Sequence, residues 1–297
     1  MPESDFHESE FHESDSPDSN RFVSTEWLAA HLGAPNLVIV DGSWHMPATG
    51  RSGREEYLAA HIPGAVFFDI DALSDISSPL PHMLPSETLF RAAMESLGIG
   101  RQMKIVVYDT EGLFSAPRVW WTLRAFGAVD VAILDGGFPK WLAEGRPTES
   151  GEAPYLPARF DATLDRDWVA SIDDVAARLA DRRAQVLDAR AVERFRGEAP
   201  EPRAGVRPGH IPGARNLPVS EVVKDGRLVD AGTIRRAVES AGIDLSKPVI
   251  TSCGSGVTAA ILWLALETIG SPPVALYDGS WTEWGSSDKP AATGPAD

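Results

Sequence analysis

Two short motifs occur twice along this chain at nearly the same separation. His61-Ile-Pro-Gly-Ala65 returns 149 residues later as His210-Ile-Pro-Gly-Ala214. Leu134-Asp-Gly-Gly-Phe-Pro-Lys-Trp141 has a counterpart 143 residues later, Tyr277-Asp-Gly-Ser-Trp-Thr-Glu-Trp284. The small difference between the two offsets indicates a short insertion, and insertions of this kind belong in loops. We therefore expect two tandem copies of one fold.

Each copy alternates short β-branched runs with longer helical ones. Strands are predicted at 37–40, 104–108, 131–134, 185–187, 249–251 and 274–276. Helices are predicted at 24–32, 86–97, 115–126, 171–180, 230–241 and 257–269, several opened by a Ser or Asp suited to N-capping. Apolar strands separated by helices are typical of parallel sheets. The predicted fold class is α/β, with a mainly parallel sheet in each copy covered by helices on both faces.

The length of 297 residues suits two domains. We place the first at 21–150 and the second at 165–287, joined by a linker at 151–164 with the boundary near residue 155 and followed by a tail at 288–297. Residues 1–20 contain seven acids and no Lys or Arg, which predicts a disordered acidic tail. His7 and His12 fit a solvated tail better than a metal site.

The formal net charge of −16 disfavours partners that are themselves anionic. Nucleic acid and anionic lipid would both be repelled, and no apolar run reaches the roughly 20 residues needed to span a bilayer. The amino terminus lacks the pattern of a secretory or organelle signal, and a lone cysteine suits a reducing compartment, so we expect the cytoplasm. No metal or cofactor is expected.

The one cysteine, Cys253, lies between a predicted strand and a predicted helix. Gly254 and Gly256 leave the backbone free to curl around the sulfur, so that successive N–H groups and the helix start would point at it. Such a nest favours a thiolate, which makes Cys253 a candidate nucleophile. The alternative is a small buried apolar side chain. In the first copy, we expect Thr110 at the matching position.

Four arginines, Arg190, Arg194, Arg196 and Arg203, follow the predicted strand at 185–187. Guanidinium groups present paired donors to a carboxylate, so these side chains could bind an anionic substrate. The alternative is that each pairs with a local acid such as Glu193 or Glu198. The residues alone leave both interpretations open.

These motifs together resemble the two-domain rhodanese family of sulfurtransferases. The resemblance runs from about residue 21 to 287 and rests on Cys-Gly-Ser-Gly-Val-Thr, the two His-Ile-Pro-Gly motifs, Asp-Gly-Gly, Asp-Gly-Ser-Trp, Arg-Phe-Arg-Gly and Pro-Glu-Pro-Arg. It implies two rhodanese-like domains, of which the second is catalytic and the first closes over its site. Helix 115–126 resembles the helix that faces the other domain in this family.

The loop after the cysteine bears on the sulfur donor. In this family a loop with two basic residues is associated with thiosulfate, whereas Cys-Gly-Ser-Gly-Val-Thr resembles that of the members that use 3-mercaptopyruvate. Residues 254–258 contain no basic side chain. The resemblance implies a ping-pong transfer of sulfur through a Cys253 persulfide, with release of pyruvate, to a thiol such as thioredoxin or a small thiol, or to cyanide.

The resemblance also implies roles for single residues. Arg194 and Arg203 would bind the donor's carboxylate and carbonyl. Ser255 and His61 would assist proton movement, although Ser52 stands where the family often has an acid. The backbone of the loop would complete the substrate site at Gly254, Gly256, Val257 and Thr258. For His61 and His210, an alternative is a structural role in a turn.

Other classes of protein fit less well. A cysteine phosphatase needs an arginine six residues after the cysteine, where this chain has Ala259, and no Gly-Lys-Ser/Thr follows the glycines as nucleotide binding would require. Two alternatives stay open: a thiosulfate sulfurtransferase, and a non-enzymatic persulfide carrier or redox sensor.

Overall fold

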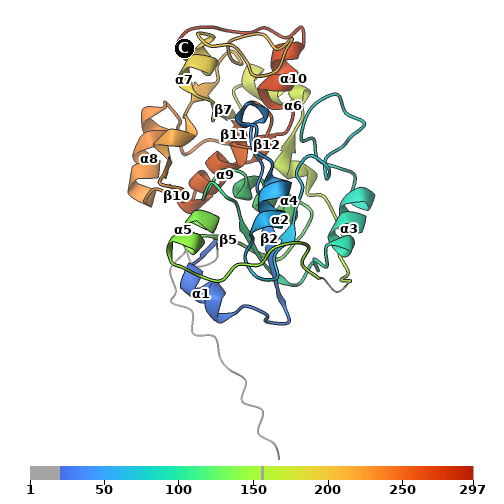
Figure 1. Cartoon of the computed structure of the whole chain (residues 1–297). Coiled ribbons are helices and arrows are strands. Elements are labelled where there is room, and N and C mark those ends of the chain that lie inside the picture. Colours follow the sequence, from blue (N-terminus) through green and yellow to red (C-terminus); the bar gives the residue numbers. More distant parts are fainter. Residues whose placement is uncertain (1–20, 155–156, 297) are drawn as a thin grey trace, which may run out of the picture.

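The computed structural model describes residues 21–154 and 157–296, which form two lobes stacked one above the other (Figure 1). The predicted acidic tail at 1–20 and the predicted boundary near residue 155 lie outside these residues. Each lobe contains a five-stranded sheet in which every pairing is parallel. The strand orders are β1-β5-β4-β2-β3 and β6-β12-β11-β7-β8. The lobes therefore repeat one topology, as the duplicated motifs predict.

The predicted strands form the centre of each sheet, and short edge strands that the sequence did not reveal complete it. In the first lobe the strands are β1 (Phe22–Val23), β2 (Leu37–Asp41), β3 (Val66–Phe67), β4 (Lys104–Tyr108) and β5 (Asp130–Leu134). In the second they are β6 (Val169–Ala170), β7 (Gln185–Asp188), β8 (Arg215–Asn216), β11 (Val249–Ser252) and β12 (Ala275–Tyr277). A small antiparallel hairpin, β9 (Val223–Lys224) and β10 (Arg227–Leu228), lies in the loop after β8.

The six predicted helices are all present. They are α1 (Thr25–Ala30), α3 (Glu87–Ser96), α4 (Ala116–Ala125), α6 (Ile172–Ala180), α8 (Ala231–Ser240) and α9 (Ala259–Thr268). Short helices that lack a clear apolar period were missed: α2 (Gly53–Ala59), α5 (Gly137–Ala143), α7 (Val192–Arg196) and α10 (Ser280–Ser286). No helix of residues 21–154 and 157–296 combines the length and apolarity that crossing a membrane would take.

Helices cover both faces of each sheet, as the predicted α/β class requires. Along β4, Ile105 and Val107 face the core that contains α3 and α4, while Val106 and Tyr108 face a second core with α1 and α5. This follows from the alternation of side chains along a strand. A strand buried on both faces is apolar at every position, which is why the central strands read as continuous apolar runs.

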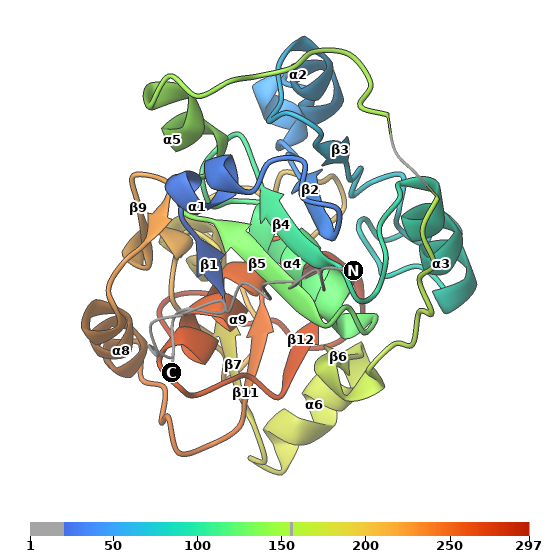
Figure 2. The ribbon, with the colours of Figure 1, turned by 90° about the horizontal axis from the view of Figure 1, so that it is seen from below.

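The two lobes meet along α4 and α9, the helices that follow their central strands (Figure 2). Trp121 packs edge-on against Trp263 across this contact, and one apolar core runs through both lobes. Arg124 of α4 donates to Glu267 of α9 at 3.0 Å. Helix 115–126 therefore faces the other domain, as the family resemblance implies. Packing two apolar helices fixes the relative position of the two loops that precede them.

Candidate active site

Cys253 directly follows β11, at the carboxyl end of the second sheet. Its N–H donates to Ser280 Oγ (3.2 Å), and its carbonyl accepts the N–H of Trp281 (3.0 Å). These bonds tie the loop to the start of α10. The side chain is 2% exposed. Ligands of parallel α/β sheets bind at this end of the strands, so the predicted position of the cysteine in the fold is confirmed.

The two glycines of the loop are required by close neighbours. A Cβ on Gly254 would lie 2.9 Å from Nη2 of Arg194, so the guanidinium rests directly over this residue. Gly256 has φ +81°, and its Cβ would lie 2.8 Å from the carbonyl oxygen of Asp278. A side chain at either position would displace the loop or the arginine. The glycines thus let charged and backbone groups approach the cysteine loop.

The first lobe has an equivalent loop, and the residue that matches Cys253 is Asp109. Tyr108 pairs with Asp41 in the strand register as Ser252 pairs with Asp188, so the next residues, Asp109 and Cys253, correspond. The Asp109 carbonyl accepts the Phe138 N–H, just as the Cys253 carbonyl accepts that of Trp281. The prediction of Thr110 at this position is wrong by one residue, because the first loop is one residue longer before its helix.

Asp109 shows how such a loop binds an anion. Its carboxylate accepts the backbone N–H groups of Glu111, Phe114, Ser115 and Ala116 at 2.7–2.9 Å. Burial raises the pKa of Asp109, and these hydrogen bonds oppose the shift. The anion-binding amides of the first loop are therefore occupied by the loop's own Asp109 side chain.

In the second lobe the matching amides are not engaged in this way. Among the described residues, no protein acceptor is seen for the backbone N–H groups of 254–259, which include Val257 and Thr258. Val257 is 2% exposed, and Thr258 stands at the N-cap of α9 without a side-chain cap bond. The main chain of this loop can thus bind a negative charge carried by the cysteine or its substrate.

Ser255 contacts a histidine of the other lobe, and this histidine is His82. Nδ1 of His82 lies 3.2 Å from Ser255 Oγ, and its Nε2 lies 3.0 Å from Oδ1 of Asp71. The hydrogen bond to His82 lowers the pKa of Asp71. Trp44 holds the far oxygen of Asp71 through Nε1 (2.9 Å) and packs edge-on against the His82 ring. The result is a chain Ser255–His82–Asp71 that leads from the buried loop to an exposed carboxylate.

The prediction that His61 meets Ser255 is wrong. His61 is 1% exposed, stacks on Tyr57 and bonds the Tyr57 carbonyl through Nδ1 (2.8 Å). His210 stacks on Phe195 and bonds its carbonyl in the same manner (2.9 Å). Both His-Ile-Pro-Gly motifs therefore have the structural role considered as an alternative.

Sequence patterns gave little warning of His82 and Asp71. Both lie in the irregular loop between β3 and α3, where no periodicity exists. The one signal is Pro81-His82-Met-Leu-Pro85, a histidine between prolines in a segment with no other structural explanation. Ser52, considered in place of an acid, is the N-cap of α2.

Arg190 and Arg194 pair with acids of the second lobe, whereas no ion pair of Arg203 is seen among the described residues. Arg190 is buried, binds Asp188 and Glu201, and lies over the Trp281 ring. Arg194 donates to Glu201 (2.5 Å), an acid that the sequence did not single out. Arg203 is half-buried, and burial lowers its pKa, while the nearby Cys253 opposes that shift. Arg194 and Arg203 thus lie beside the cysteine loop, and Arg190 shares the carboxylate of Glu201 with Arg194.

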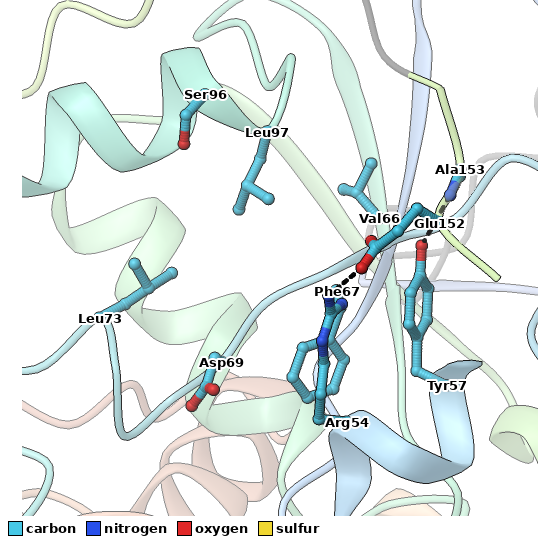
Figure 3. A pocket seen from close by; sticks show the side chains of 10 residues that line it. All are labelled: Arg54, Tyr57, Val66, Phe67, Asp69, Leu73, Ser96, Leu97, Glu152 and Ala153. Atoms are coloured by element: carbon cyan, nitrogen blue, oxygen red, sulfur yellow. Dashed lines mark hydrogen bonds and ion pairs between the residues drawn. The ribbon is translucent and has the colours of Figure 1, made fainter. Parts of the chain in front are cut away.

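A separate surface pocket of about 340 Å³ lies in the first lobe (Figure 3). Its Arg54 guanidinium lies 5.5 Å from the ring centroids of both Tyr57 and Phe67 and pairs with Glu152. The Tyr57 hydroxyl donates to the Ala65 carbonyl and accepts the Ala153 N–H. These contacts fasten the segment that leaves the first lobe, and the pocket contains none of the predicted site residues.

Fold and site define a class: tandem parallel α/β domains, one with a cysteine in an amide-lined loop and the other supplying residues that close over it. Residues 24–144 and 171–287 each match the Rhodanese-like domain. The chain belongs to the rhodanese family, so the predicted family and fold are confirmed.

The relatives are sulfurtransferases. The 3-mercaptopyruvate sulfurtransferase of Rattus norvegicus is 47% identical over 88% of this chain and 91% of its own, and that of Escherichia coli (strain K12) is 46% identical over 89% and 95%. A thiosulfate sulfurtransferase of Bos taurus is 44% identical over 88% and 91%. The crystal structure of an Escherichia coli 3-mercaptopyruvate sulfotransferase superposes with a TM-score of 0.82, at 44% identity over 88% of this chain and 98% of that one. The predicted enzyme class is therefore confirmed.

Proposed function

We propose that this protein transfers sulfur from 3-mercaptopyruvate to a thiol or cyanide through a persulfide on Cys253. The observation that carries the proposal is the loop 253–258, in which the backbone N–H groups of 254–258 have no protein acceptor among the described residues and no basic side chain is present. A thiosulfate dianion calls for extra positive charge in this loop, whereas a monocarboxylate can be met by Arg194 and Arg203 from the side. Relatives are named for 3-mercaptopyruvate or for thiosulfate, so the choice of donor proposed here rests on the chemistry of the loop.

In the first half-reaction the Cys253 thiolate attacks the donor sulfur. The carbon–sulfur bond breaks, its electron pair stays with the three-carbon fragment, and pyruvate leaves as its enolate. The outer sulfur remains on Cys253 as a persulfide. Arg194 and Arg203 hold the carboxylate and carbonyl of the donor, and the loop amides stabilise the charge on sulfur, as their counterparts do for Asp109.

The enolate needs a proton where it leaves. Ser255 Oγ–H can donate to it and recover a proton from His82, whose other nitrogen faces Asp71. Asp71 reaches solvent, so the chain connects a buried reaction to bulk water.

In the second half-reaction an acceptor thiolate or cyanide attacks the outer sulfur and restores the Cys253 thiolate. A small thiol or thioredoxin is proposed as acceptor. The cytoplasm is proposed as the compartment, because a reducing environment regenerates a lone reactive thiol.

The test compares donors on purified protein. Wild type should release pyruvate from 3-mercaptopyruvate with a thiol acceptor, and Cys253→Ser should release none. Mass spectrometry after donor alone should show one added sulfur on wild type. Stronger turnover of thiosulfate would favour a thiosulfate sulfurtransferase. A persulfide already present on the purified protein, with no sulfur taken up and no pyruvate released from 3-mercaptopyruvate, would favour the carrier.

The arginines are tested against a matched control. Arg203→Ala should raise the KM for 3-mercaptopyruvate by roughly 10-fold or more, since a charge-assisted contact contributes about 1.5–3 kcal/mol. Arg183→Ala removes an exposed arginine at the opposite end of the sheet, before β7, and should change nothing. An equal rise in the KM for thiosulfate would remove the discriminating role of Arg203.

A further inference from the structure

A buried arginine of the first lobe reaches into the loop of the second. Arg118 of α4 has a side chain that is 3% exposed and donates to three acceptors. Its Nη2 lies 2.7 Å from Asp278 Oδ1 and 2.7 Å from the His82 carbonyl, and its Nη1 lies 3.3 Å from the Gly256 carbonyl. One guanidinium therefore connects the backbone of the histidine segment with the backbone of the cysteine loop.

Asp278 completes the connection from the other lobe. Its second oxygen accepts the N–H of Leu84 at 2.8 Å, and its side chain is also 3% exposed. The pair thus fixes both the carbonyl of His82 and the amide two residues later. A buried charge pair is maintained only where further hydrogen bonds satisfy both groups, and here they do.

The segment held in this way has an unfavourable backbone conformation. His82 has φ +61°, in the left-handed region that a residue with a Cβ rarely adopts. Such a conformation persists only where its surroundings impose it. The same backbone turn aims the His82 ring at Ser255 Oγ and Asp71. Arg118 and Asp278 supply hydrogen bonds on both sides of that turn.

The other lobe offers a natural comparison. Asp135 occupies the position of Asp278 in the repeated Asp-Gly motif, and it too pairs with an arginine of the opposite lobe, Arg227 of β10. That pair is on the surface, with side chains 53% and 26% exposed. It joins the lobes but is bonded to no residue of the Ser255–His82–Asp71 chain. Arg227–Asp135 is therefore an interdomain pair away from the site, and Arg118–Asp278 is an interdomain pair at the site.

We propose that Arg118 and Asp278 are positioning residues for sulfur transfer, which hold His82 in register with Ser255. This inference rests on the proposed function, because it assigns the pair a role in the proton step of that reaction. Neither side chain has a hydrogen bond to Sγ of Cys253 in the described part of the chain. Their effect passes through the His82 backbone, and loss of the pair lets the ring move away from Ser255.

The experiment measures steady-state kinetics of pyruvate release for Arg118→Gln, Asp278→Asn and the control Arg227→Gln. The two site variants should lose roughly 10- to 100-fold in kcat, since displacing a reacting group by about 1 Å has that effect. KM should stay within about threefold, and Arg227→Gln should keep wild-type kcat. The pH profile of kcat in Arg118→Gln should resemble that of His82→Asn.

A double variant makes the positioning role specific. In a His82→Asn background, Arg118→Gln should cause no further loss of kcat, because the group it positions is already gone. The inference would be overturned if the kcat loss of the double variant equalled the product of the two single losses. It would also be overturned if Arg118→Gln had the same kcat as Arg227→Gln. Arg118→Lys serves if Arg118→Gln fails to fold: it keeps the charge but cannot reach three acceptors, so kcat should still fall, and a wild-type kcat would equally overturn the inference.

Failure of the inference and failure of the proposed function give different results. If wild type releases pyruvate and Cys253→Ser does not, the proposed function stands whatever Arg118 does. If wild type releases no pyruvate, the proposed function and the inference fall together.

Discussion

Replacing Gly256 with alanine tests whether the backbone of the cysteine loop contributes to the chemistry. Gly256 has φ +81°, where a residue with a Cβ loses roughly 1–2 kcal/mol. The new methyl group would also lie 2.8 Å from the Asp278 carbonyl oxygen and 3.0 Å from Nη1 of Arg118, so the loop must move. Overpacking adds roughly 1–3 kcal/mol, so the free energy of unfolding should fall by about 2–5 kcal/mol.

Gly213→Ala is the matched control in the same domain. Gly213 has φ +83°, but its nearest neighbour would be a Leu179 methyl group at 3.9 Å. This variant should lose only the roughly 1–2 kcal/mol of the backbone term and keep its kcat. Gly256→Ala should in addition lose about 10-fold or more in kcat, because the displaced loop moves its amide groups relative to the donor.

Both quantities are measured on the same samples. Urea unfolding followed by tryptophan fluorescence gives the free energies, and pyruvate release at saturating 3-mercaptopyruvate gives kcat. Equal kcat values for the two alanine variants would refute the reasoning, since the close approach would then have no catalytic consequence. A stability loss in Gly256→Ala no larger than in Gly213→Ala would refute the packing argument.

Two further predictions concern single side chains. His82→Asn, which tolerates the positive φ, should lower kcat for pyruvate release by about 100-fold or more, whereas His61→Asn should lower thermal stability and leave kcat intact; the reverse pattern would restore His61 to the site. Burial raises the pKa of Asp41 from 3.8 to about 6. Asp41 therefore ionises at lower pH in the unfolded chain than in the folded protein, so wild type loses stability as pH rises through that range. Asp41→Asn removes this dependence, and its unfolding free energy relative to wild type should rise by about 3 kcal/mol between pH 3.5 and 7. Asp188→Asn, at the matching position, should destabilise by a few kcal/mol at both pH values, because it removes a partner of buried Arg190; parallel curves for wild type and Asp41→Asn would contradict the argument.

Local sequence patterns predict much of the fold. The repeated motifs gave two copies, the apolar runs gave the central strands, and Ser24, Ser86, Ser171 and Asp230 cap their helices as predicted. Edge strands of two residues and short helices were missed, because so few residues carry no period. The position of Cys253 followed from a strand, two glycines and a helix that are adjacent in sequence.

The composition of the site was only partly predictable. Arg194 and Arg203 lie on the same lobe as Cys253, 59 and 50 residues before it in the chain, and the sequence indicated both. Glu201, which pairs with Arg194, was not singled out, although local acids were expected to compete. The assignment of His61 relied on a motif whose histidine is used to build a turn.

The amino-acid sequence by itself determined two parallel α/β lobes and a cysteine at the carboxyl end of a strand, since these depend on neighbours within one segment. Only the tertiary structure decided which groups of the first lobe meet that cysteine. His82 and Arg118 reach the loop of that cysteine, at Ser255 and Gly256, because α4 packs on α9 and so sets one loop against the other. Contacts of this kind depend on the relative placement of two folded bodies, which no local pattern records.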